Sequence, residues 1–205
     1  NGYDPDKLDQ SVKKIDKKYF NITYAGRIYP DQNMEPFVLA LRRFIEQIGP
    51  SGPSLLRINF HGIVDSEAFT YLKKTIPNEI LHVEKERIPS DEMYDKISTS
   101  SILFIMSYNK PGVYSGKLMD YVGSYRNILM IPSDDGVISE FIKNGDLGLS
   151  TNDVEKASDF LIEKFMEWKK YGQPIHHGDG EFISKSSRKY QAALLANGIK
   201  ELVNR

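Results

Sequence analysis

Apolar residues along the chain follow two alternating patterns. Some form short runs. Between these runs, apolar residues recur at every third or fourth position, which is typical of amphipathic helices. The short runs, several of them interrupted by a polar residue or glycine, have strand length and predict strands at residues 21–25, 55–60, 80–83, 101–106, 127–131 and 147–149.

Helical spacing is clearest between Met34 and Ile48, and Gly49-Pro50 ends that pattern. Asn152 and Glu155 have the spacing of a capping box at the start of another helix. The other predicted helices cover residues 66–75, 90–97, 115–124 and 137–142, and a terminal amphipathic helix follows a polar connector at 172–180.

Strands and helices that alternate in this way predict a Rossmann-like α/β fold, a doubly wound parallel sheet with helices on both faces. After Ser101, the run at 101–106 is apolar at every position, which favours a central strand covered on both sides. In such sheets, ligands bind beyond the carboxyl ends of the strands. Candidate binding residues therefore belong to the loops that follow the strands, including those after Ala25 and Met106.

Composition narrows the classes of function. Lys plus Arg total 27 against 28 Asp plus Glu, whereas proteins that bind nucleic acid broadly carry a basic excess. The absence of cysteine excludes disulfides, thiolate metal sites and cysteine nucleophiles. No apolar run approaches the roughly 18 residues of a membrane span, and no signal peptide is visible. We therefore expect no nucleic-acid partner and no membrane span.

The first candidate site is Gly26-Arg27, directly after the first predicted strand. A glycine at a strand end lets the backbone approach a ligand closely, and an arginine beside it can bind phosphate oxygens with two donors. A turn glycine followed by a surface arginine is the alternative interpretation of the same pair.

The second candidate site lies at residues 114–121, YSGKLMDY, where a helix follows the most apolar strand. Free amides at a helix start, together with Lys117, make an anion site. Asp120 lies about one turn further on and faces the same side as Gly116 and Lys117, so its carboxylate could accept hydrogen bonds from ribose hydroxyls. The alternative is a solvated helix start with an ion pair between Lys117 and Asp120.

Several segments resemble, in the same order, the donor domain of GT-B glycosyltransferases of the family 4 type. Residues 20–29, FNITYAGRIY, resemble the stretch that reads TGRLY or GRL after the first strand of that family. Residues 115–121 resemble its GKLFEYL motif, and residues 127–129 follow where the family has PIL. Residues 1–4, NGYD, resemble the NGxD junction between its two domains, and residues 191–195 resemble its closing helix.

The resemblance implies roles for individual residues. Arg27 would bind the donor diphosphate, and the amides near Ser115 and Gly116 would face the same group together with Lys117. Asp120 takes the place of the family's glutamate that holds the ribose, with a side chain one methylene shorter. Arg27 and Lys117 would be the catalytic residues, since they stabilise the departing diphosphate.

Other positions complete or depart from the family pattern. The resemblance places Gly26 at the close approach to the diphosphate, and Arg87 and Ile88 in the loop that contacts the base. The family's lysine five residues after the arginine is Gln32 here, and its first glutamate would fall at Gly112.

For the whole chain, the resemblance implies a transferase that moves a sugar from a nucleotide-diphosphate sugar to an acceptor hydroxyl, with retention and without a metal or other cofactor. Residues 1–172 would form the donor domain. Residues 173–205 would form a connector and a helix that packs on this domain or on an amino-terminal, acceptor-binding domain of the parent enzyme. Such enzymes serve polysaccharide biosynthesis, and we expect a cytoplasmic protein, in peripheral contact with the inner face of the membrane through its parent.

Other features carry less weight. Asp4-Pro5-Asp6 spells a D-x-D metal motif but lies in a turn, and His176-His177 lies in a connector. His61 is expected to be structural, and Asp134-Asp135-Gly136 to be a turn and a helix cap. Two rival functions remain open at this point: a nucleotide-sugar epimerase, and a non-enzymatic or degenerate α/β binding module.

Overall fold

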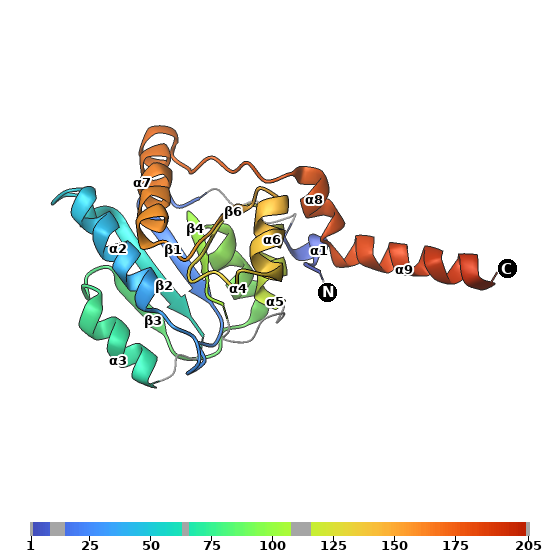
Figure 1. Cartoon of the computed structure of the whole chain (residues 1–205), viewed down its shortest axis with the longest axis horizontal. Coiled ribbons are helices and arrows are strands. Elements are labelled where there is room, and N and C mark those ends of the chain that lie inside the picture. The colour runs from blue at the N-terminus through green and yellow to red at the C-terminus, as the bar shows by residue number, and fades with distance from the viewer. Residues whose placement is uncertain (1, 9–14, 63–65, 108–115, 204–205) are drawn as a thin grey trace.

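A single parallel sheet forms the centre of the molecule, as the sequence predicts (Figure 1). The computed structural model describes residues 2–8, 15–62, 66–107 and 116–203. All neighbouring strands in it pair in parallel, in the order β3-β2-β1-β4-β5-β6. The strands are β1 (Phe20–Ala25), β2 (Leu56–His61), β3 (Leu81–Glu84), β4 (Ile102–Ile105), β5 (Asn127–Met130) and β6 (Gly148–Ser150).

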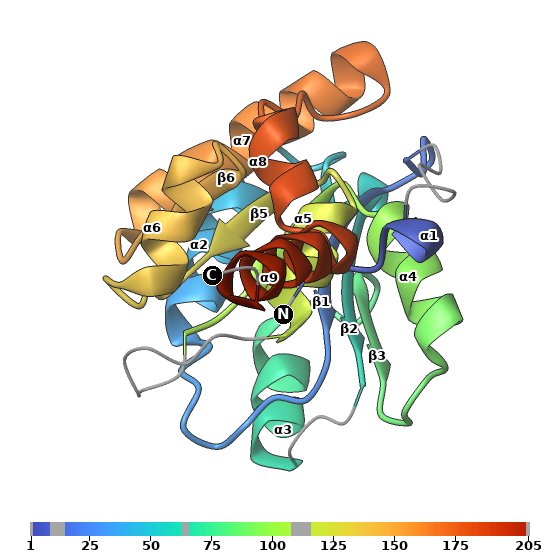
Figure 2. The ribbon, with the colours of Figure 1, turned by 90° about the vertical axis from the view of Figure 1, so that its right-hand side faces the viewer.

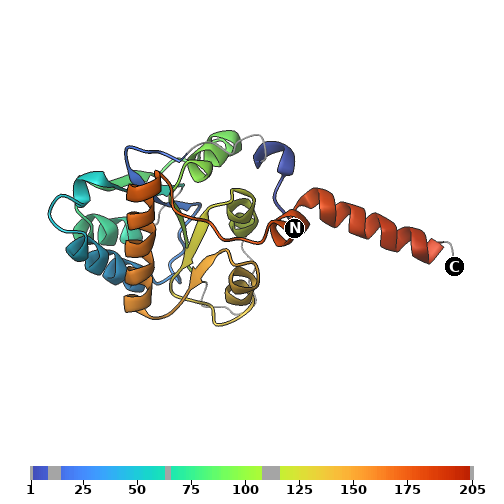
Figure 3. The same cartoon turned by 90° about the horizontal axis from the view of Figure 1, so that it is seen from above.

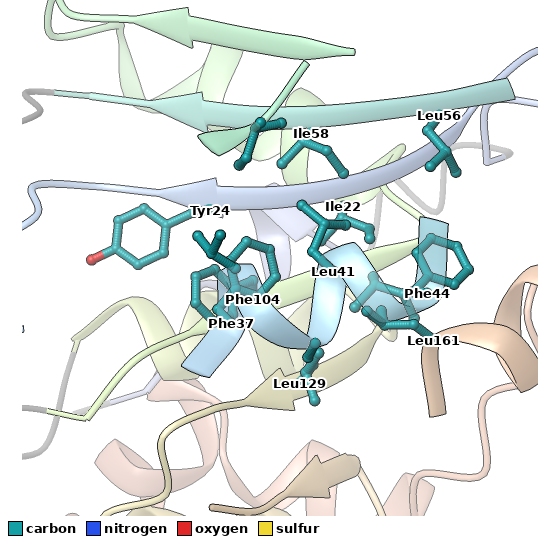
Figure 4. Packing of buried hydrophobic residues seen from close by; sticks show 14 of the residues in the cluster. Ile22, Tyr24, Phe37, Leu41, Phe44, Leu56, Ile58, Phe104, Leu129 and Leu161 are labelled. Atoms are coloured by element: carbon teal, nitrogen blue, oxygen red, sulfur yellow. The ribbon is translucent and has the colours of Figure 1, made fainter. Parts of the chain in front are cut away.

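Successive strand residues point to opposite faces of the sheet, so apolar side chains lie on both faces, and helices cover both. Phe104 belongs to one buried cluster, which α2, α3 and α7 cover, and Leu103 and Ile105 belong to the other, which α1, α4, α5, α6 and α8 cover. Figure 4 shows part of the first cluster. The helices are α1 (Pro5–Leu8), α2 (Glu35–Gln47), α3 (Ser66–Thr75), α4 (Ser90–Ser98), α5 (Gly116–Gly123), α6 (Val137–Asn144), α7 (Val154–Tyr171), α8 (Gly180–Lys185) and α9 (Arg188–Val203), and a short 3-10 turn, η2, spans Pro53–Leu55.

The start of α7 differs from the sequence prediction. Asp153, not Asn152, caps the helix, and its carboxylate accepts the amides of Glu155 and Lys156 at 2.8 and 3.2 Å. The Asn152 side chain is engaged elsewhere: it accepts the amide of Ser133 and donates to Asp135. A long-range contact with a neighbouring loop therefore overrides the local capping-box spacing.

The two ends of the chain meet on one side of the molecule. Tyr3 pairs with Ser187, and the Arg188 amide donates to the Tyr3 carbonyl at 2.9 Å. Figures 1 and 2 accordingly place the amino terminus beside the start of α9. Ile183 of α8 is buried in the second cluster, whereas α9 extends away from the body (Figure 3). The division at residue 172 stays a prediction.

The strand order fixes where ligands can bind. From β1 the chain continues to β2 on one side, and β4 pairs with β1 on the other side. The chain therefore continues from β1 and from β4 toward strands on opposite sides, and at such a switch point a crevice forms at the carboxyl end of the sheet. Gly26 follows β1 and α5 follows β4, so both predicted sites belong to this crevice. No helix within the described residues combines the length and apolar content that crossing a bilayer requires.

Candidate functional site

Gly26 and Lys117 lie in contact at the crevice between β1 and α5. Gly26 has φ +119°, a conformation that favours glycine, and a Cβ added there would lie 3.2 Å from both Cε and Nζ of Lys117. The lysine side chain therefore lies across the glycine backbone. The structure brings together two residues that are 91 positions apart and that the sequence analysis treated as separate candidates.

The Lys117 ammonium is held by Tyr24 of β1. Nζ donates to the Tyr24 hydroxyl at 2.6 Å and lies 4.1 Å from the centroid of the Tyr24 ring. Burial lowers the pKa of Lys117 to about 7, since desolvation disfavours the charged amine. Among the described residues, no carboxylate forms an ion pair with Lys117, so the alternative pairing with Asp120 is absent.

Asp120 and Tyr121 follow Lys117 on the same face of α5, at the i+3 and i+4 positions. Together with Ala25, Gly26, Met93 and Ile97, these three residues line a cavity of about 220 Å³. Burial raises the pKa of Asp120 to about 6, an effect that Arg188 opposes and Asp4 adds to. The Tyr121 hydroxyl accepts the Ala25 amide at 2.8 Å and ties α5 to the end of β1.

Arg27 is next to this cavity along the chain, but its side chain does not line it. The residue is exposed, and its guanidinium lies 5.3 Å from the ring centroid of Tyr29. The Arg27 carbonyl accepts the Tyr24 hydroxyl at 3.0 Å, so the backbone of Arg27 is tied to the residue that holds Lys117. The predicted phosphate contact therefore requires the exposed guanidinium to turn toward the cavity.

The other predicted residues take different places. Gly116 is exposed at the first position of α5, next to Lys117. Arg87 is exposed and Ile88 partly buried between β3 and α4, and neither lines the cavity with Lys117 in the part of the chain that the structure describes. Ser115 and Gly112 lie outside the described residues.

Gln32 has a structural task at the position where the resembling family often has a lysine. The side chain is buried, its Oε1 accepts the Tyr29 amide at 3.0 Å, and its Nε2 donates to the Met106 carbonyl at 3.4 Å. These bonds fix the loop between β1 and α2 against the end of β4. Gln32 therefore stabilises the loop that follows β1 and, because it is uncharged, supplies no cation to the site.

His61 is anchored at the end of β2. Its Nδ1 lies 2.8 Å from a carboxylate oxygen of Glu84 on β3, and Lys96 donates to the other oxygen at 3.1 Å. Burial lowers the pKa of His61, although the hydrogen bond to Glu84 opposes the effect. This network supports the expectation of a structural histidine.

Asp134 caps a turn, as predicted, by accepting the amides of Gly136, Ile138 and Ser139. Burial raises the pKa of Asp134, but the hydrogen bonds from the Ser139 hydroxyl and from these amides together outweigh it, so the pKa is lowered. Within the described ranges, no group of three or more His, Asp or Glu side chains is placed to hold a metal ion.

A second cavity, of about 470 Å³, lies between the β1–α2 loop and α3. Its charged side chains are Asp31, Glu35 and Glu67. All three are acidic, so this larger cavity would repel a diphosphate. The smaller cavity beside Lys117 is the better anion site despite its size.

Sequence reasoning missed the two tyrosines that assemble the site. In the sequence, Tyr24 cannot be distinguished from the other apolar residues of its predicted strand. Tyr121 likewise cannot be distinguished from the other apolar residues of its predicted helix. The local sequence at either position gives no sign that the hydroxyls cross between β1 and α5, because the partners are 93 and 96 positions away.

Comparison with solved structures identifies proteins that share the fold of this chain. No protein-family model matches the sequence, and no curated protein shows a significant sequence match. By structure, the chain is similar to the C-terminal domain of a glycosyl transferase group 1 family protein (LpcC) from Francisella tularensis, with a TM-score of 0.60 and 14% identity over 90% of this chain and 93% of that one.

Two larger proteins contain the same arrangement. HepE from Anabaena, solved in complex with UDP and glucose, gives a TM-score of 0.69 at 9% identity, over 98% of this chain and 56% of that one. The trehalose 6-phosphate synthase of Burkholderia multivorans gives 0.64 at 10% identity, over 97% and 45%. The chain has the fold of a GT-B glycosyltransferase C-terminal domain.

The GT-B fold agrees with the resemblance drawn from the sequence motifs, which is confirmed at the level of fold. The chain spans about half the length of HepE and of the trehalose 6-phosphate synthase. The cavity beside Lys117 lies at the carboxyl end of β1, next to the start of α5. The roles of the individual residues stay predictions.

Proposed function

We propose that this chain is the donor-binding half of a glycosyltransferase, which transfers a sugar from a nucleotide-diphosphate sugar to an acceptor hydroxyl. The observation that carries the proposal is the position of Lys117. Its ammonium lies over Gly26 at the switch point of the sheet, without a carboxylate partner among the described residues. A partly buried cation at the start of a helix is suited to a phosphate group.

Charge development explains why such a cation would accelerate transfer. When the bond between the anomeric carbon and the diphosphate breaks, negative charge grows on the departing phosphate. Lys117, Arg27 and the amides near Gly116 would stabilise that charge more strongly than the ground state, which lowers the barrier. Three such donors can replace a divalent metal, so we propose a metal-independent reaction, and the family resemblance adds retention at the anomeric carbon.

Asp120 would orient the nucleoside. Its carboxylate faces the same cavity as Lys117 and can accept hydrogen bonds from two ribose hydroxyls. The raised pKa of Asp120, about 6, leaves this carboxylate ionised at neutral pH. The acceptor site would belong to an amino-terminal domain, so we expect this chain alone to bind donor weakly and to transfer little.

Calorimetric titration with UDP, GDP and ADP at pH 7.0, where about half of the free molecules carry a protonated Lys117, tests the proposal. We expect one of them to bind, and we expect Arg27→Ala and Lys117→Ala each to weaken binding at least about tenfold, the loss of one charged contact of roughly 1.4 kcal/mol. Arg42→Ala and Lys156→Ala remove exposed cations from α2 and α7 and serve as matched controls. Equal weakening by controls and site variants would point to bulk electrostatics instead.

The two rival functions, a non-enzymatic binding module and a nucleotide-sugar epimerase, predict other results. A non-enzymatic module binds none of the three nucleotides, which would overturn the proposal. A nucleotide-sugar epimerase would convert UDP-glucose to an epimer without any acceptor, which NMR of the sugar detects.

A further inference from the structure

Tyr24 is a buried tyrosine whose ring packs like a phenylalanine. It is 1% exposed and lies 5.9 Å from the ring centroid of Phe60 and 5.8 Å from that of Phe104. Figure 4 shows its hydroxyl pointing away from the labelled apolar side chains. A phenylalanine would fill the same space, so packing alone does not account for the hydroxyl, which needs hydrogen-bond partners when buried.

Those partners come from both sides of the proposed donor site. The hydroxyl accepts from Lys117 Nζ at 2.6 Å and donates to the Arg27 carbonyl at 3.0 Å, with Gln32 Oε1 at 3.5 Å. One side chain thus connects the first turn of α5 to the loop that carries Arg27. The packed ring leaves the oxygen little freedom, so Tyr24 fixes the position of the Lys117 ammonium that donates to it.

Lys117 depends on this contact for its charge. Its neighbours in the cavity are Asp120 and Tyr121 from α5, Met93 and Ile97 from α4, and Ala25 and Gly26 at the end of β1. Asp120 forms no ion pair with Lys117, and the two α4 residues are apolar. The Tyr121 hydroxyl oxygen already accepts a hydrogen bond from the Ala25 amide. The oxygen and the ring face of Tyr24 therefore provide the main stabilisation of the ammonium.

We propose that Tyr24 is a positioning residue for donor binding: its hydroxyl and ring hold the Lys117 ammonium over Gly26 in the charged form that a diphosphate requires. This inference rests on the proposed function of the site. It adds a residue that never touches the donor and acts through Lys117.

Tyr24→Phe is the test, because it removes only the oxygen. Binding of UDP is measured between pH 7 and 8, above the titration of Asp120 and of the terminal phosphate of UDP, whose pKa is about 6. Inorganic pyrophosphate, which titrates again in the alkaline range, is compared between the two proteins at the same pH. We expect roughly tenfold weaker binding at pH 8 and a smaller loss at pH 7, since without its acceptor Lys117 loses its proton at lower pH. Tyr71→Phe, on α3 and outside the cavity, is the matched control.

A purely structural role gives a different result. In that case Tyr24→Phe weakens binding equally at every pH, or lowers the melting temperature without changing affinity, and either outcome overturns the inference. The double variant Tyr24→Phe/Lys117→Met should bind no more weakly than Lys117→Met, because Tyr24 acts only through the amine.

One measurement separates this inference from the proposed function. If none of UDP, GDP, ADP and pyrophosphate binds the unmodified chain, the proposed function fails. NMR of the Lys117 side chain in the free protein still shows whether Tyr24→Phe moves the titration of the amine to lower pH. An unchanged titration would exclude the positioning role by itself.

Discussion

At the scale of single residues, two glycines decide how closely the ends of β1 and β2 can approach. Gly26 has φ +119° and Gly62 has φ +117°. A Cβ at Gly62 would lie 3.0 Å from the backbone carbonyl of Gly26, and a Cβ at Gly26 would meet Lys117. The site therefore depends on positions that have no side chain.

Gly26→Ala should lower both stability and nucleotide binding. An alanine is strained at this φ, at a cost of about 1–2 kcal/mol, and its methyl group displaces Lys117. Urea unfolding and UDP titration measure the two effects. Gly180→Ala is the control, because a Cβ there meets nothing within 4 Å and φ is not in the positive range; equal behaviour of the two variants would contradict the packing of Lys117 on Gly26.

Asp120 offers a prediction about pH. Burial raises its pKa from 3.8 to about 6, so the unfolded chain loses this proton first as pH rises. The ionised carboxylate therefore destabilises the fold progressively between about pH 4 and 6, and at neutral pH the penalty is at most roughly 3 kcal/mol.

Asp120→Asn should remove that penalty. We expect the variant to be more stable than the unmodified chain at pH 7.5 and nearly equal to it at pH 4, while its nucleotide binding is weaker. Urea unfolding at the two pH values measures the difference. Asp159→Asn, on the exposed side of α7, provides the comparison, and a gain in stability that is the same at both pH values would refute the pKa argument.

At the scale of elements, α7 shows how a helix end is chosen. Asp153 accepts two amides of the first turn, and Gly172 ends the helix with φ +77°. Between these ends, Ala157, Leu161 and Phe165 are buried in the first core cluster. The helix position is thus fixed by a cap at the start, a left-handed glycine at the end and an apolar stripe between them.

Asp153→Ala should destabilise the chain by about 1 kcal/mol, because the first amides of α7 lose their acceptor. Thermal or urea unfolding measures the change. Asp159→Ala, on the same helix but outside the first turn, is expected to change stability by less than about 0.5 kcal/mol. A larger effect for Asp159 than for Asp153 would show that α7 is capped in another way.

At the scale of the whole molecule, α8 and α9 have different relations to the core. Ile183 is fully buried, and Phe182 lies 4.7 Å from the ring centroid of Phe141. In contrast, every residue from 190 to 203 is exposed, and α9 extends beyond the body in Figure 3. Its exposed apolar side chains are those of Tyr190, Leu194, Leu195, Ile199, Leu202 and Val203.

Removal of residues 190–205 should leave the fold nearly as stable as before, since no described residue in that segment is buried. Ile183→Ala should instead cost about 2–4 kcal/mol, because it opens a cavity in the second cluster. Unfolding curves of both variants measure the contrast. A truncated chain that unfolds as easily as the Ile183 variant would mean that α9 packs against the body.

The sequence by itself determined the alternation of strands and helices, the doubly wound fold class and the segments that carry Gly26, Lys117 and Asp120. Those features follow from apolar periodicity and from glycines at strand ends, which are local signals within a few residues. The motif resemblance also anticipated the GT-B fold. Periodicity could not identify which polar atoms meet across the sheet.

Only the tertiary structure decided the contacts of Tyr24, the structural task of Gln32, the position of the Arg27 guanidinium near Tyr29 and the cap at Asp153. Each depends on a side chain that reaches a neighbouring element or loop, and the same residues in another strand order would meet other partners. The physical reason is that hydrogen bonds and desolvation act over a few ångströms in space, whereas the sequence records only proximity along the chain.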